Sequence, residues 1–243
     1  MISIICACNN EKILNEMLNK SLKKQSYKDY ELIVIDAQKH GFNSASETLN
    51  YGASIAKGEI LVFIHQDIEF IYDNALEKIV KYCKDNEFAI AGLCGIDDTG
   101  EYNIYSSVTI GKTHRQAGTK INSIMNVYAL DECCLIIKKE RFKKFEDFGK
   151  TWHFYAVEYC MRAKKQNENV LLFPIEMYHL SPGWSLDYSY FNTLIKVAKR
   201  YPDEKKIKTC MGVFKNNYFL SIYCMYRKVK IFIKKILHYQ KYE

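Results

Sequence analysis

Three polar residues, His65, Gln66 and Asp67, directly follow an apolar run at residues 61–64. If the chain stays extended, the imidazole and the carboxylate two positions apart point to the same side. Both groups are ligands of divalent cations, and together they could equally hold one polar substrate. The spacing therefore favours a metal or polar-ligand site at the end of a strand, with an ordinary polar strand exit as the alternative.

The surrounding sequence alternates between short apolar runs and amphipathic segments. The apolar runs predict buried strands at 2–7, 30–36, 60–64, 88–93, 133–137 and 170–173. Helical periodicity predicts helices at 12–24, before Gly58, from Asp73 onward and at 152–165. Continuous rather than alternating apolar runs are typical of parallel strands covered by helices, so we expect an open α/β sheet. Residues 97–130 are expected to be irregular, and "YHLSPG" at 178–183 to be a loop.

Ligands of open α/β sheets bind beyond the carboxyl ends of the strands. Asp36 ends the second expected strand, and His65 and Asp67 follow the third. The sheet would therefore bring these polar residues to one edge, which strengthens the case for a binding site.

Composition narrows the class of protein. With 243 residues and 48% hydrophobic content, the chain can bury one substantial core. Its nine cysteines are scattered and form no C-x-x-C pair, which argues against a zinc ribbon and favours reduced thiols. No signal peptide and no stretch long enough for a membrane span are evident, so we expect a cytoplasmic protein.

The positive charge is concentrated at the C-terminal end. Residues 205–243 carry a net charge of +9, and the first 204 residues carry −2 of the total of +7. Aromatic and aliphatic residues alternate with the lysines there, which predicts a basic amphipathic helical tail on a domain of residues 1–204. Such a tail can lie on an anionic membrane surface, or pack on its own domain or a partner. Nucleic acid is not expected as a partner.

Two long segments carry a family resemblance. "ISIICACNNEKILNEMLNKSLKKQSYKDYELIVIDA" and "NYGASIAKGEILVFIHQDIEF" resemble the nucleotide-sugar half of GT-A-fold glycosyltransferases of the inverting family 2. His65-Gln66-Asp67 stands where that family carries Asp-x-Asp. With "TWHFYAVEYCMRAKK" and "YHLSPG" downstream, the chain most resembles the branch related to the StrF-type domain. The resemblance covers roughly residues 2–183. We expect a nucleotide-sugar half at about 1–96 and an acceptor half at about 97–204.

The resemblance also implies roles for individual residues. The cofactor it implies is a divalent cation, Mn²⁺ or Mg²⁺, and imidazole ligands favour Mn²⁺. The nucleotide-binding residues it implies are Ala7, Cys8, Asn9, Asn10, Asp36 and His65. The metal ligands it implies are Asp67 and His179, with His65 beside them.

The general base departs from the family pattern. Aligning "EYCMRA" with the family's "DLCLRA" places Glu158 on the later acidic position and Ala156 where the usual base stands. Glu158, His153 or an acidic residue of "ALDECC" (Asp131 or Glu132) remain as alternatives, and without any of them activity would be weak or lost. Trp152 and Tyr155 are expected either to stack on a sugar or to pack in the core.

The resemblance implies a metal-dependent, inverting glycosyltransferase. It would move a sugar from a nucleotide-diphosphate donor, a UDP-sugar by preference, to a saccharide or lipid-linked acceptor in polysaccharide or glycoconjugate assembly. The expected location is the cytoplasm, with peripheral attachment to the inner face of the membrane. One alternative is a catalytically weak or silent sugar-nucleotide-binding protein. Another is a nucleotidyltransferase, although "ACNNEK" is not the Gly-rich basic loop that such enzymes carry.

Overall fold

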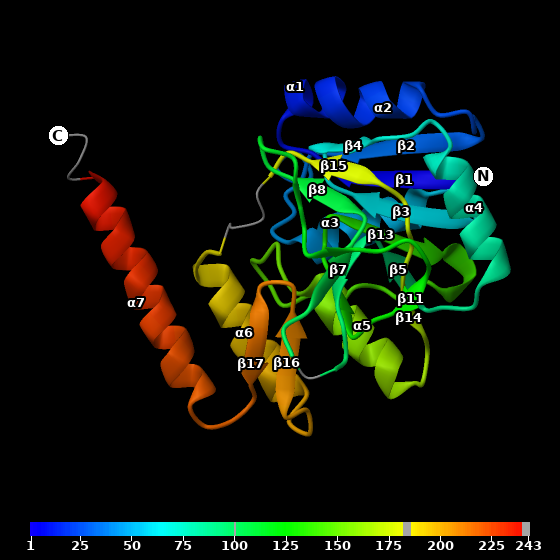
Figure 1. The fold of residues 1–243 in the computed structure, drawn as a ribbon. Coiled ribbons are helices and arrows are strands. Elements are labelled where there is room, and N and C mark those ends of the chain that lie inside the picture. Colours follow the sequence, from blue (N-terminus) through cyan, green and yellow to red (C-terminus); the bar gives the residue numbers. More distant parts are fainter. Residues whose placement is uncertain (100, 182–185, 240–243) are drawn as a thin grey trace.

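A computed structural model of the chain describes residues 1–99, 101–181 and 186–239. Its centre is a seven-stranded sheet in the order β11-β14-β5-β13-β3-β1-β2 (Figure 1). These strands are β11 (Met125–Asn126), β14 (Val170–Leu172), β5 (Ile90–Gly92), β13 (Cys134–Lys138), β3 (Ile60–Ile64), β1 (Ile2–Ala7) and β2 (Tyr30–Ile35). Helices flank this sheet, which confirms the expected α/β class.

The sheet is mixed, which corrects part of the expectation. β1 runs parallel to both β2 and β3, and β14 runs parallel to β5. β13, however, lies between β3 and β5 and is antiparallel to both, and β11 is antiparallel to β14. An apolar run indicates that a strand is buried on both faces. The central β13 is buried in this way although it is antiparallel to its neighbours, so the run did not reveal its direction.

Helices cover both faces of the sheet because β1 and β3 are apolar on both sides. One face, which includes Ile4 and Val62, packs on the first helical segment and on α4 (Ala75–Asp85). The other face, which includes Ile5 and Phe63, packs on α3 (Ala45–Ile55), α5 (Tyr155–Lys165) and α6 (Tyr188–Arg200). The first segment, expected as one helix, is α1 (Glu11–Leu14), a π-helical turn η1 (Asn15–Asn19) and α2 (Lys20–Lys23).

Short strands fill the region that was expected to be irregular. Residues 97–130 contain six strands of two or three residues each: β7 (Ile104–Ser106), β8 (Val108–Ile110), β9 (Arg115–Gln116), β10 (Thr119–Lys120), β11 and β12 (Ala129–Leu130). All of them except β11, which belongs to the central sheet, join β4 (Ile68–Phe70), β6 (Cys94–Ile96) and β15 (Met177–His179) in two small sheets. His179 therefore lies at the end of a strand, where the sequence had predicted a loop. Residues 182–183 of "YHLSPG" lie outside the described residues. Strands this short are below the length at which alternation is readable.

The expected helical tail is a hairpin followed by a helix. β16 (Lys206–Thr209) and β17 (Gly212–Lys215) pair antiparallel, and their Ile207 and Phe214 belong to the hydrophobic core. The helical expectation holds from α7 (Leu220–Tyr239), which packs beside α6 at the edge of the molecule (Figure 1). Among the described residues, no helix has the length and apolarity required to cross a membrane.

Candidate active site

A cleft of about 780 Å³ opens at the carboxyl ends of β1, β2 and β3. It brings together residues from Ala7 to Met211, which lie 204 positions apart in the sequence. Nine of the expected site residues line it: Ala7, Cys8, Asn9, Asp36, His65, Asp67, Asp131, His153 and His179. Asn10 and Glu158 do not.

One corner of the cleft is built by His65, Asp67 and His179. β3 ends at Ile64, and the chain turns through residues 66–67 before entering β4, so the extended geometry assumed from sequence does not persist. β15 pairs with β4 and delivers His179 to this turn, where its Nε2 lies 3.3 Å from Oδ1 of Asp67. One potential ligand atom from each of the three residues lies within 4.8 Å of the others.

The chemistry of this corner fits a divalent cation. Nε2 of His179 is buried and makes no hydrogen bond of good geometry with any residue that the structure describes, although the Asp67 carboxylate is close. Burial, followed by the charge of His179, lowers the pKa of His65 and favours the neutral imidazole that a metal ligand requires. Burial raises the pKa of Asp67, but the close contact with the His179 imidazole outweighs it and keeps the carboxylate ionised. The backbone N–H of Ser181 donates to Oδ2 of Asp67 (3.2 Å) and fixes its orientation.

Gln66 ties this corner to the loop after β1. Its Oε1 accepts hydrogen bonds from the backbone N–H groups of Asn9 (3.1 Å) and Asn10 (2.9 Å), and its Nε2 donates to Oδ1 of Asn9 (2.6 Å). The Asn10 side chain instead caps α1 by accepting from the N–H of Ile13, which explains why it is absent from the cleft. Sequence reasoning did not select Gln66, and its position inside the tripeptide was the only signal for it.

Replacing Gln66 by Ala should weaken binding of a nucleotide-sugar donor by about tenfold, because the loop after β1 loses all three tethering hydrogen bonds. Isothermal titration of donor into wild type and variant measures the change. An unaltered Kd would show that the loop holds its position without Gln66.

Asp36 lies on the opposite side of the cleft, at the end of β2. Its Oδ1 accepts from the backbone N–H groups of Gln38 (3.0 Å) and Lys39 (3.2 Å), and Oδ2 lies 3.3 Å from Nζ of Lys39. The hydrogen bond from the Lys39 backbone is the main reason that the pKa of Asp36 is lowered. The carboxylate therefore shapes its own turn while lining the cleft.

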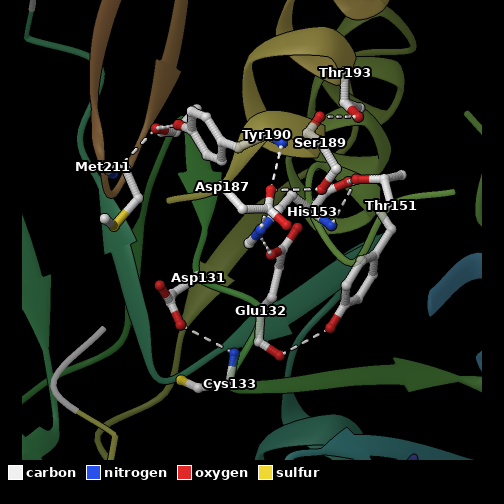
Figure 2. Close-up of polar contacts among 12 residues, drawn as sticks. Asp131, Glu132, Cys133, Thr151, His153, Asp187, Ser189, Tyr190, Thr193 and Met211 are labelled. Atoms are coloured by element: carbon white, nitrogen blue, oxygen red, sulfur yellow. Dashed lines mark hydrogen bonds and ion pairs between the residues drawn. The ribbon is translucent and has the colours of Figure 1, made fainter. Parts of the chain in front are cut away.

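Glu132 and His153 line the cleft and form a charged cluster with Asp187 (Figure 2). Nδ1 of His153 lies 3.9 Å from Oε2 of Glu132, and Nε2 lies 3.7 Å from Oδ1 of Asp187. Burial lowers the pKa of His153, but the two carboxylates outweigh it and the net shift is upward. Burial raises the pKa of Glu132, and His153 opposes this only in part. Asp187, the N-cap of α6, was not selected from the sequence.

Asp131 lies apart from this cluster. Glu132 extends toward His153, whereas the Asp131 carboxylate lies to the other side, with Oδ1 accepting from the backbone N–H of Cys133 at 3.0 Å (Figure 2). Asp131 and His179 line both the main cleft and an adjoining cavity of about 290 Å³, and this second cavity is otherwise mostly apolar. Asp131 therefore lies at the boundary between the cleft and the second cavity.

Trp152 and Tyr155, both in the expected acceptor half, differ in solvent exposure. Trp152 is 48% exposed and lines the cleft, which leaves it free to contact a ligand. Tyr155 is buried, and its hydroxyl donates to the backbone carbonyl of Glu132 at 3.2 Å. Between them, Phe154 has φ of +72° at the start of α5, in the left-handed region that a bulky side chain rarely adopts.

Glu158 is inside the core and not at the cleft. It is fully buried, accepts a hydrogen bond from the Tyr201 hydroxyl (2.6 Å), and lies 3.3 Å from the guanidinium of Arg162. A carboxylate held in this way cannot reach a substrate hydroxyl in the cleft. Sequence alignment placed Glu158 beside the base position, but α5 buries that side of the helix. The structure therefore removes the geometric basis for Glu158 as the base.

Glu158→Gln should lower the free energy of unfolding by about 1–3 kcal/mol, because Arg162 loses its buried counter-charge while the Tyr201 hydrogen bond is kept. Urea unfolding measures this loss. A variant with wild-type stability and greatly reduced turnover would return Glu158 to the list of catalytic candidates.

The mixed α/β sheet with helices on both faces matches the GT-A fold of glycosyltransferases. The chain belongs to the glycosyltransferase-like family, whose model matches residues 3–209. No curated protein matches the sequence. The finer likeness to the StrF-type branch stays a prediction.

Solved structures support the fold at low sequence identity. Mannosyltransferase PcManGT from Pyrobaculum calidifontis, in complex with GDP-Man and Mn²⁺, matches with a TM-score of 0.53 and 13% identity, over 85% of this chain and 65% of that one. S. aureus TarS 1–349 matches with a TM-score of 0.52 and 17% identity, over 82% and 64% of the two chains. The same protein in complex with UDP-GlcNAc matches with a TM-score of 0.53 and 16% identity, over 82% and 65%. The chain thus spans about two thirds of the length of these structures.

Proposed function

We propose that the protein is a metal-dependent, inverting glycosyltransferase that uses a nucleotide-diphosphate sugar, with a UDP-sugar as the preferred donor. The observation that carries the proposal is one cleft in which Gln66 joins the loop after β1 to a corner of His65, Asp67 and His179. Membership of the glycosyltransferase-like family supports the reaction class.

Different residues would bind the nucleoside and the diphosphate of the donor. The loop of Ala7, Cys8 and Asn9, together with Asp36, would hold the nucleoside, and the His/Asp corner would hold Mn²⁺ or Mg²⁺ at the diphosphate. When bound, the cation supplies positive charge that stabilises the departing nucleotide. Neutral His65 and ionised Asp67 are the protonation states that this role needs.

For the base we propose Asp131. It lies where the cleft and the apolar cavity meet, so a hydroxyl entering from the cavity reaches its carboxylate before the donor. His153 is the weaker candidate, because its neighbouring carboxylates favour the imidazolium, which has no lone pair to accept a proton. His153 instead holds Glu132 and Asp187 in place along the cleft wall.

The second cavity supports a saccharide or lipid-linked acceptor. Its walls include Tyr102, Ile104 and Ile110, and Arg115 adds one cationic group. Apolar and aromatic walls suit the hydrophobic face of a sugar or an attached lipid chain, and the guanidinium suits a phosphate. Such acceptors belong to polysaccharide or glycoconjugate assembly.

A second candidate is a sugar-nucleotide-binding protein with weak or no turnover. Ala156 favours it, since this position carries no side chain that could take a proton. This protein would keep the donor-binding half of the cleft and lack the chemistry of the other half.

A panel of nucleotide-diphosphate sugars tests the proposal. With Mn²⁺ present, we expect donor hydrolysis or transfer with at least one sugar, and its loss on addition of a chelator. Donor binding without turnover in every pairing would favour the silent binding protein. Turnover that persists in chelator would contradict the metal-dependent mechanism.

A further inference from the structure

The C-terminal helix α7 has two opposite apolar faces, and only one of them is covered. On the inner face Leu220 and Cys224 are buried, and Ile231 packs partly against the core. Towards α6, Arg227 stacks over the Phe191 ring. These contacts fix which side of α7 points away from the protein.

The outward side carries a continuous apolar stripe. Its members recur at intervals of three and four residues, so they share one face of the helix. Each is between 43% and 60% exposed, and together we call them the outer stripe: Ile222, Met225, Tyr226, Val229, Phe232, Ile233 and Ile236. Tyr218 (85% exposed) and Phe219 (66% exposed) precede the helix and extend the apolar surface. A contiguous surface of this kind marks an interaction site.

Every charge on α7 is positive. The helix contains Arg227 and lysines at 228, 230, 234 and 235, and no Asp or Glu. Lys228 donates to Asn192 on α6, while Lys230 and Lys234 are exposed on the helix. A 20-residue helix of this composition is about 30 Å long, which allows it to lie along a surface.

We propose that the outer stripe of α7 lies in the headgroup region of an anionic lipid bilayer, with Lys230 and Lys234 contacting the headgroups. A helix with an apolar face and basic flanks binds such interfaces through buried apolar area and attraction to anionic lipid. The rival occupant is a second copy of this chain. Two such helices placed stripe to stripe would carry only positive charges, and neither helix has an acidic residue that could form a salt bridge with the other, which opposes pairing. This proposal is independent of the glycosyltransferase reaction.

Vesicle flotation of the full chain, without donor, tests the proposal. We expect binding to phosphatidylcholine vesicles that contain phosphatidylglycerol, weak binding to pure phosphatidylcholine, and weakening at high salt. Met225→Gln with Phe232→Gln should lower binding about 100-fold, because two interfacial apolar side chains are lost while a good helix former is kept. Lys230→Gln with Lys234→Gln should lower it about 30-fold.

The matched control is Ile55→Gln with Ile71→Gln, two side chains that are each 47% exposed outside α7. This control should bind vesicles as the wild type does. Equal binding by the stripe variant and the control would overturn the proposal. So would a dimer in lipid-free solution that dissociates in the stripe variant, because the second copy would then be the occupant. Transfer to a soluble acceptor is measured separately, so loss of membrane binding and loss of the proposed reaction remain distinguishable.

Discussion

Asp67→Asn should lower sugar transfer by about 10³-fold, the largest effect that we expect from a single substitution. Asp67 provides the only carboxylate in the His65–Asp67–His179 corner, and its Oδ1 lies 3.3 Å from His179. Replacing it with an amide keeps the shape of the side chain and the contact with Ser181 but removes the negative charge that holds a cation. Initial rates with saturating donor and Mn²⁺ measure the loss.

Cation binding gives a second readout that does not depend on turnover. A ligand at about 100 times its Kd adds about 2.7 kcal/mol to the free energy of unfolding, so Mn²⁺ should raise the melting temperature of the wild type and leave that of Asp67→Asn unchanged. Asp73→Asn, at an exposed carboxylate outside the cleft, is the control and should behave as the wild type. Equal Mn²⁺ stabilisation of Asp67→Asn and wild type would show that the cation binds elsewhere.

Asp131→Asn should lower kcat by about 10²- to 10⁴-fold while donor affinity stays the same, because an amide cannot take a proton from an acceptor hydroxyl. The amide oxygen can still accept from the Cys133 N–H, so the local turn is preserved. Donor titration and transfer assays on the same preparation separate the two quantities.

Glu158→Gln provides the contrast for this experiment. It also converts a carboxylate to an amide, but in the core beside Tyr201 and Arg162. We expect Asp131→Asn to lose turnover with stability retained, and Glu158→Gln to lose stability with turnover retained in the folded fraction. If Asp131→Asn turns over normally, His153 becomes the residue to test next.

The sequence predicted the sheet well where strands are long and apolar. β1, β2 and β3 were placed within about one residue, and nine of the site residues expected from the sequence line one cleft. The direction of β13 could not be predicted from the sequence, because a strand that is buried on both faces is apolar throughout in either orientation.

The failures concern contacts that no local pattern records. Glu158 was a candidate base, but α5 packs against the core and Oε1 of Glu158 accepts a hydrogen bond from Tyr201 in a distant segment. Gln66 and Asp187 act through partners 57 and 34 residues away, respectively, and their residue types alone indicate neither bond. Pairings of this range depend on the finished fold.

The left-handed backbone of Phe154 has a consequence for evolution and engineering. A bulky residue in this conformation costs about 1–2 kcal/mol, which the fold retains immediately after His153 and before α5. Phe154 is only 1% exposed and belongs to the hydrophobic core, so a glycine at this position would recover the strain but lose about 3–5 kcal/mol of packing, and selection for thermostability should keep the phenylalanine. Core packing alone thus explains why a strained residue persists next to His153, without any selection for activity at position 154.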